Sequence, residues 1–185
     1  MYRLSILTGE RPMPRSHSAA LPIAYVVLKL LVILNWLVGA AILALLAVLP
    51  NEQWIMRAFE IAPSPDTHRL VVGLRAIAVL GLVTIPINYV ILRRLLAMVG
   101  TVRVGDPFVA ANAMRLRAIA WALLALQLLS LVIAAIGKSV STPAHPVHLD
   151  AGFSVNGWLA VLLTFILARV FVEGALMRDD LEGTI

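Results

Sequence analysis

The chain has 185 residues, is 61% hydrophobic and only 14% charged, and carries a formal net charge of +5. A soluble domain is usually about 45–50% apolar and about 25% charged. A water-soluble chain of this length could not bury so much apolar surface, which disfavours a soluble enzyme, a secreted domain and a disordered tail. Cysteine is absent, which excludes a disulfide framework, a thiolate metal site and a cysteine nucleophile.

Four segments are long and apolar enough to cross a bilayer, whose hydrocarbon core of about 30 Å needs about 20 residues of helix. We predict spans at about residues 22–49, 70–96, 114–136 and 153–176. The runs are continuous and lack the two-residue alternation of a membrane β-strand. The sequence therefore predicts an all-α integral membrane protein, a four-helix bundle that forms one domain over residues 1–185.

The basic residues predict the orientation of these spans. Nine of them lie in the N-terminal tail, in or beside the loop 97–113, or in the C-terminal tail, whereas three lie in the loops 50–69 and 137–152. The nine are Arg3, Arg11, Arg15, Arg93, Arg94, Arg103, Arg115, Arg117 and Arg178. The positive-inside rule therefore places both termini and the loop 97–113 in the cytoplasm, and the other two loops outside.

Ionisable residues at the ends of the apolar runs have two interpretations. Lys29, Arg75 and Arg169 can extend their charged groups to the membrane surface. The alternative is an ion cluster between the first and last helices, in which Glu173 pairs with Lys29 and, at the i,i+4 spacing, with Arg169. No acidic residue lies in the middle of a predicted span, so a proton-coupled transporter would lack its usual carrier group.

Uncharged polar residues at depth in the spans favour packing through interhelical hydrogen bonds. They are Asn35, Thr84, Asn88, Gln127, Ser130 and Thr164. The alternative is that Asn35, Asn88 and Gln127 form a polar path through an oligomer. The chain would then be a small transporter or channel subunit.

The loop 137–152 contains His145, His148 and Asp150, whose side chains are able to bind a metal ion. Two histidines and one carboxylate in an irregular loop are a weak metal signal, so we expect solvated loop residues and no cofactor. The sequence also lacks a serine hydrolase triad, a glycine-rich phosphate loop and a His-Glu-x-x-His zinc motif. We therefore expect no enzymatic activity; an enzyme working through His145 and His148 is the alternative.

The most specific pattern is Gly105-Asp106-Pro107-Phe108, followed by Asn112 and by Arg115-Leu116-Arg117. Aspartate suits a helix N-cap and proline the first helical position, so this pattern predicts that a helix begins at Asp106. A charged, amphipathic extension follows the last span. The candidate partner-binding or structural residues in these two segments are Asp106, Pro107, Phe108, Asn112, Arg115, Arg117, Glu173, Gly174, Glu182, Thr184 and Ile185.

The Gly-x-Pro-Phe-x3-Asn-x2-Arg-Leu-Arg segment and the tail Leu181-Glu182-Gly183-Thr184-Ile185 resemble a bacterial family of small four-span membrane proteins, classified only as a domain of unknown function. Members of that family often accompany a small helix-turn-helix regulator. The resemblance implies a membrane-bound regulator or sensor partner of a cytoplasmic helix-turn-helix transcription factor, located in the bacterial cytoplasmic (inner) membrane. It implies no catalytic residues. The simpler alternative is that Phe108, Asn112 and the tail only pack together beneath the bundle.

The arginines of the loop 97–113 have a simpler explanation than direct nucleic-acid binding. The aromatic residues that interleave with basic ones on a nucleic-acid surface are missing here. Attraction to anionic lipid head groups accounts for the same charges. The expected partners are therefore the lipid bilayer and a cytoplasmic regulator, and an oligomer is compatible with the sequence.

Overall fold

A computed structural model describes residues 20–48, 65–105, 107–141 and 151–182, and every regular element among them is an α-helix. The helices are α1 (Ala20–Val48), α3 (Pro65–Val104), α4 (Ala110–Val140) and α5 (Val155–Glu182). All four are long and apolar enough to cross a membrane. The prediction of an all-α membrane protein with four spans is confirmed, and the chain is a multi-pass membrane protein.

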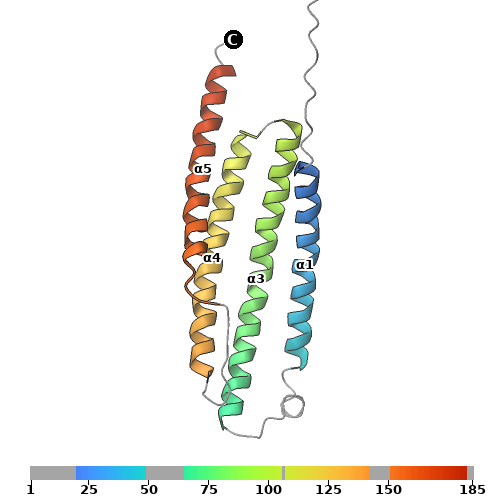
Figure 1. Ribbon diagram of the computed structural model, residues 1–185, viewed down its shortest axis with the longest axis vertical. Coiled ribbons are helices and arrows are strands. Elements are labelled where there is room, and N and C mark those ends of the chain that lie inside the picture. Colours follow the sequence, from blue (N-terminus) through green and yellow to red (C-terminus); the bar gives the residue numbers. More distant parts are fainter. Residues whose placement is uncertain (1–19, 49–64, 106, 142–150, 183–185) are drawn as a thin grey trace, which may run out of the picture.

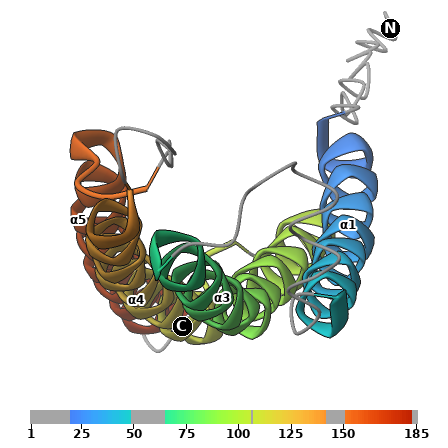
Figure 2. The ribbon, with the colours of Figure 1, turned by 90° about the horizontal axis from the view of Figure 1, so that it is seen from below.

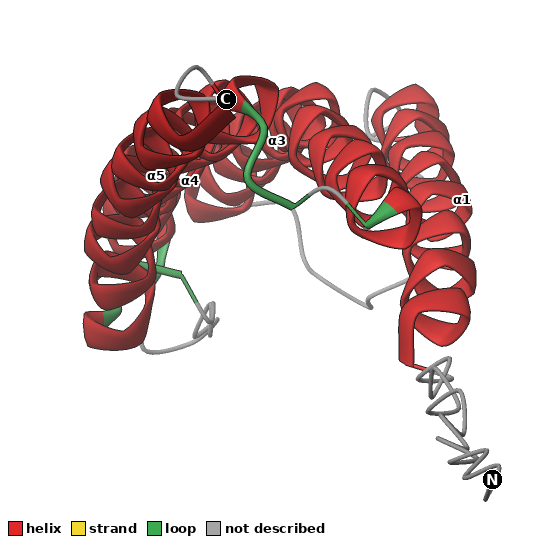
Figure 3. Cartoon of the chain, turned by 90° about the horizontal axis from the view of Figure 1, so that it is seen from above, coloured by secondary structure: helices red, strands yellow, loops and turns green. Residues whose placement is uncertain are grey.

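The helices pack in chain order as a curved row. Extensive contacts join α1 to α3, α3 to α4, and α4 to α5. Neighbours run antiparallel (Figure 1), and the view along the helices shows an open arc with α1 and α5 at its two ends (Figures 2 and 3). No more than 22% of the apolar window of any span is buried in the chain itself. Most of the apolar surface of the spans is therefore left uncovered by the chain itself, as suits helices in a lipid bilayer.

The helices extend well beyond the predicted spans around the loop 97–113. Helix α3 has 40 residues, which corresponds to about 60 Å of helix, twice the thickness of the hydrocarbon core. It is followed by Gly105, whose φ of 91° favours glycine and whose N–H donates to the Val102 carbonyl at 3.1 Å. Helix α4 begins at Ala110, so residues 105–109 alone connect the two helices.

One face of α1 packs closely against α3 around Asn35 and Gly39. The buried Asn35 donates from Nδ2 to the carbonyl oxygen of Ile85 at 3.1 Å. One turn along α1, a Cβ atom on Gly39 would lie 3.2 Å from the Ile85 side chain. The Trp36 and Tyr89 rings meet beside them, with centroids 5.6 Å apart. In a membrane, close backbone approach and interhelical hydrogen bonds provide the packing that apolar surface alone does not.

Glycines also set the spacing of the other two helix pairs. A Cβ atom on the buried Gly73 of α3 would overlap the Val140 side chain of α4. Between α4 and α5, a Cβ atom on Gly157 would overlap the side-chain amide of Gln127. These small residues allow α3, α4 and α5 to approach closely.

Candidate functional site

The α3–α4 connection is held by the buried side chain of Asn112, the third residue of α4. Its Nδ2 donates to Thr101 Oγ1 at 2.7 Å and to the Pro107 carbonyl at 2.8 Å. Its Oδ1 accepts from Arg115 Nη1 at 2.7 Å. Asn112 is 0% exposed, whereas its three partners are partly buried. These four residues, here called the Asn112 cluster, join the last turn of α3 to the first turns of α4.

The predicted start of this helix was wrong. Helix α4 begins at Ala110, with Val109 as its N-cap at φ −93° and ψ 142°, and Pro107 lies before it in the non-helical connection. The reason is the Pro107 carbonyl. As the first helical residue, Pro107 would offer that oxygen to a backbone N–H of α4, but the Asn112 side chain binds it instead. Asp106, the predicted N-cap, lies outside the described residues.

The connection is also packed against α5. The Phe108 and Phe171 rings lie with centroids 5.3 Å apart. A Cβ atom on Gly174 would lie only 3.0 Å from Phe108 Cδ1, so the absence of a side chain at this position lets the ring rest on α5. The structure therefore brings together Phe108 and Gly174 as well as Asn112 and Arg115, all predicted as candidate residues.

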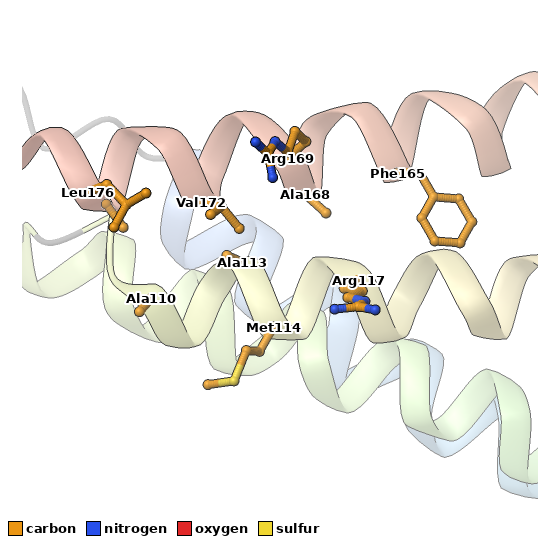
Figure 4. A pocket seen from close by; sticks show the side chains of 10 residues that line it. Ala110, Ala113, Met114, Arg117, Phe165, Ala168, Arg169, Val172 and Leu176 are labelled. Atoms are coloured by element: carbon orange, nitrogen blue, oxygen red, sulfur yellow. The ribbon is translucent and has the colours of Figure 1, made fainter.

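Beside this contact, α4 and α5 enclose a hollow of about 470 Å³, here called the α4–α5 groove. Figure 4 shows residues that line it, Met114 and Arg117 on α4 and Arg169, Val172 and Leu176 on α5. Its lining residues are Ala110, Ala113, Met114, Arg117, Phe165, Ala168, Arg169, Val172, Ala175 and Leu176. The groove thus combines apolar walls with two guanidinium groups.

The rim of the groove carries both signs of charge. Arg169 Nη2 lies 2.6 Å from Glu173 Oε1, the pair that the i,i+4 spacing predicts. The two side chains are 76% and 47% exposed, so the pair contributes little to stability. Arg117 is exposed on the opposite wall.

Apolar side chains stay exposed at the end of the groove that lies toward the C-terminus of α5. Arg169 ends the uncharged stretch of α5, and Met177 follows it by eight residues, or about 12 Å along the helix. Leu176 and Met177 are 54% and 62% exposed there, and Met114 is 67% exposed on α4. Helix α5 begins at Val155, so the about 20 residues that cross the hydrocarbon core end near Gly174, and Leu176 and Met177 follow at the level of the head groups.

A family comparison bears on the same segments. The sequence profile described as "Protein of unknown function (DUF2975)" matches residues 56–185, which is more than half of the chain. The chain belongs to this family. The matched part includes α3, α4 and α5, with the Asn112 cluster and the α4–α5 groove, whereas α1 precedes it. No curated protein and no solved structure matches the chain.

The predicted ion cluster is only partly assembled. Arg169 and Glu173 pair on α5, but the structure does not bring Lys29 to them. Lys29 lies on α1, at the opposite end of the arc, with Nζ 4.8 Å from the centroid of the Tyr25 ring. The predicted ion pair between Glu173 of α5 and Lys29 of α1 is therefore not formed in this arrangement.

Of the polar residues at depth, Asn35 and Gln127 lie at two separate helix contacts. Asn35 is engaged by α3, and Gln127 fills the space over Gly157 of α5. Thr84 and Thr164 donate to carbonyl oxygens of their own helices at 2.6 Å. Their arrangement fits packing between helices.

Several other candidate residues fall outside the part of the chain that the structure describes. They are His145, His148, Asp150, Thr184 and Ile185. Glu182 ends α5, but its side chain is not described. Among the described residues, no group of three or more potential metal ligands is present.

Thr101 is the member of the Asn112 cluster that the sequence does not reveal. Its hydroxyl donates to the Met98 carbonyl at 2.8 Å and accepts from Asn112. A threonine in the last turn of an apolar helix commonly bonds its own backbone, so the residue type alone does not indicate the second contact.

Proposed function

We propose that this chain is a non-enzymatic integral membrane protein that binds a soluble protein at the α4–α5 groove. The partner we propose is a small cytoplasmic helix-turn-helix transcription factor, for which the chain would act as a membrane-bound regulator or sensor. The observation that carries the proposal is the exposure of Leu176 and Met177 beyond the level of Arg169. Exposed apolar side chains beside charged ones, such as the Arg169–Glu173 pair, are typical of protein interaction sites.

The shape of the groove supports a helical partner. An amphipathic helix binds by placing its apolar face in a groove between two helices. The α4–α5 groove offers apolar walls from Met114, Val172 and Leu176, with Arg117 and Arg169 at its edges. Such a partner would carry acidic residues beside its apolar face, because charges at the rim favour complementary partners.

The Asn112 cluster supports the proposal by fixing the site. Three hydrogen bonds hold the start of α4, and the Phe108–Phe171 contact holds α5 against it. A surface that is already ordered loses less conformational entropy when a partner binds. The packing role of these residues and the docking role of the groove are therefore compatible.

The distribution of charge supports a cytoplasmic location for this end of the molecule. Each helix has a basic residue where its uncharged stretch ends on this side. Lys29 and Arg93 line one cavity between α1 and α3. Arg117 and Arg169 line the α4–α5 groove. Because basic residues concentrate on the cytoplasmic side, we infer that this end faces the cytoplasm of a bacterial inner membrane.

Binding to purified regulators would test the proposal. The full chain in lipid nanodiscs would be presented with helix-turn-helix regulators of the same organism, each purified separately. Leu176→Asp should weaken binding of the cognate regulator by about thirtyfold, the loss typical of a buried apolar interface residue. Val155→Asp is the matched control, because Val155 is 61% exposed at the opposite end of α5. Equal losses in the two variants, or no binding by any such regulator, would contradict the proposal.

A further inference from the structure

A second hollow lies between α1 and α3, at the other side of the arc from the α4–α5 groove. It measures about 300 Å³ and is lined by Lys29, Val32, Ile33, Tyr89, Arg93 and Leu96. We call it the α1–α3 groove. It lies outside the surface assigned above to a protein partner, so it does not depend on that assignment.

Two cations, Lys29 and Arg93, line this groove, and Arg103 shares the Tyr25 ring with Lys29. Lys29 Nζ lies 4.8 Å from the centroid of the Tyr25 ring, and the Arg103 guanidinium carbon lies 5.5 Å from the same centroid. On α3, Arg93 and Arg103 are ten residues apart and share one helix face with Gly100. A Cβ atom on Gly100 would meet nothing within 4 Å, so this face is open between the two arginines.

The two helices provide no carboxylate for these cations. Helix α1 contains no acidic residue, and Asp66, the one acidic residue of α3, lies at the far end of that helix. Helix α1 packs chiefly on α3, and the Arg169–Glu173 pair lies on α5 at the opposite end of the arc. Within the described part of α1 and α3, Lys29, Arg93 and Arg103 have no carboxylate at this end of the helices, which favours binding of an anion.

The position of the groove along the membrane normal identifies the anion. Lys29 precedes the uncharged residues 30–48, and Arg93 follows the uncharged residues 76–92. Both cations therefore lie where the hydrocarbon ends, at the level of the lipid phosphates. Val32 and Ile33 continue the groove toward the hydrocarbon and can contact an acyl chain. Tyrosine rings such as Tyr89 are common at this level of the membrane.

The geometry points to a binding site in the α1–α3 groove for the phosphate of an anionic glycerophospholipid. Arg93 would donate to the phosphate oxygens in a forked arrangement, and Lys29 would contribute a point charge. Arg103, held over Tyr25, would raise the positive potential at the mouth of the groove. Basic pockets between membrane helices bind anionic head groups in this way.

Native mass spectrometry of the full chain in a neutral detergent would measure this binding. Phosphatidylglycerol would be titrated against the natural chain and against the double variant Lys29→Gln, Arg93→Gln. We expect the double variant to bind this lipid about thirtyfold more weakly, because it no longer has the two positive charges that face the phosphate. A double variant with the same net charge, Arg94→Gln with Lys138→Gln, should bind it as the natural chain does. Neither of these two residues lines the groove.

Three further measurements complete the test. Phosphatidylcholine, which has a phosphate but no net charge, should bind much more weakly than phosphatidylglycerol. Gly100→Leu should weaken phosphatidylglycerol binding without a change in charge, because the new side chain would occupy the open face between Arg93 and Arg103. Circular dichroism would verify that each variant remains helical.

Four results would overturn the assignment. The first is an equal loss of phosphatidylglycerol binding in the charge-matched double variant, and the second is equal affinity for phosphatidylglycerol and phosphatidylcholine. The third is unaltered phosphatidylglycerol affinity in both Gly100→Leu and the double variant Lys29→Gln, Arg93→Gln. The fourth is displacement of the lipid by inorganic phosphate at the same concentration. The last result would indicate a site for a free anion rather than for a lipid.

Discussion

Replacing Asn112 with alanine should lower the free energy of unfolding by more than the replacement of a single polar residue usually does. The change removes the two bonds that the amide donates to Thr101 and Pro107 and the one it accepts from Arg115. A neutral hydrogen bond contributes about 0.5–1.5 kcal/mol net, and one with a charged partner about 1.5–3 kcal/mol. Thr101 keeps its bond to Met98, and the half-buried Arg115 can reach water, which reduces the loss. We therefore expect the free energy of unfolding to fall by about 2–4 kcal/mol.

Unfolding in mixed micelles, followed by circular dichroism as the fraction of denaturing detergent rises, would measure this loss. Asn156→Ala is the matched control, since Asn156 is an exposed asparagine near the start of α5 and should change the free energy of unfolding by less than about 0.5 kcal/mol. A double-mutant cycle with Thr101→Ala should give a coupling energy of at least about 0.5 kcal/mol, because the two side chains share a bond. If Asn112→Ala behaved like the control and showed no coupling to Thr101, the account of the Asn112 cluster would be wrong.

Four further predictions concern the helix contacts and the tail. Gly73→Ala should destabilise the fold by about 1–3 kcal/mol because its Cβ atom would overlap Val140, and Val140→Ala in the same chain should restore most of that loss in the same unfolding titration. Gly100→Ala, on the same helix but facing open space, should leave stability unchanged or raise it by up to about 1 kcal/mol, so equal effects at the two glycines would refute the overlap. Asn35→Leu should cost about 0.6 kcal/mol, the usual value of an interhelical hydrogen bond in a membrane; a cost above about 2 kcal/mol would mean that Asn35 does more than bind Ile85. Deletion of residues 181–185 should abolish pull-down of the regulator while membrane insertion persists, and retained pull-down would exclude the tail from the interaction.

The four spans are predictable because long uncharged runs have one interpretation in a bilayer. The order of the helices in space is less accessible to sequence analysis, since α1 is apolar on all sides and no face of it is marked for a neighbour. Packing instead depends on single positions such as Gly73 and Gly157. Nothing in the sequence distinguishes these glycines from Gly100, which meets no other helix.

The candidate site, too, is predictable from the sequence in part only. The motif at residues 105–117 identifies the segment, and Asn112 and Phe108 prove to be the residues that hold it in place. The local preference of Asp106 and Pro107 for a helix start fails, because a side chain five residues ahead binds the Pro107 carbonyl. The α4–α5 groove could not be predicted, since its walls come from two helices whose relative rotation is set by packing.

Site-specific photo-cross-linking in living cells tests the central claim most directly. A photoreactive amino acid would replace Met177, which is 62% exposed beyond the level of Arg169, and in a second strain Val155 at the opposite end of α5. The account predicts that illumination of the first strain joins the chain to a soluble helix-turn-helix regulator, and that the second strain forms no such product. Lipid or a second copy of the chain as the sole product at position 177, or the same regulator captured from position 155, would contradict it.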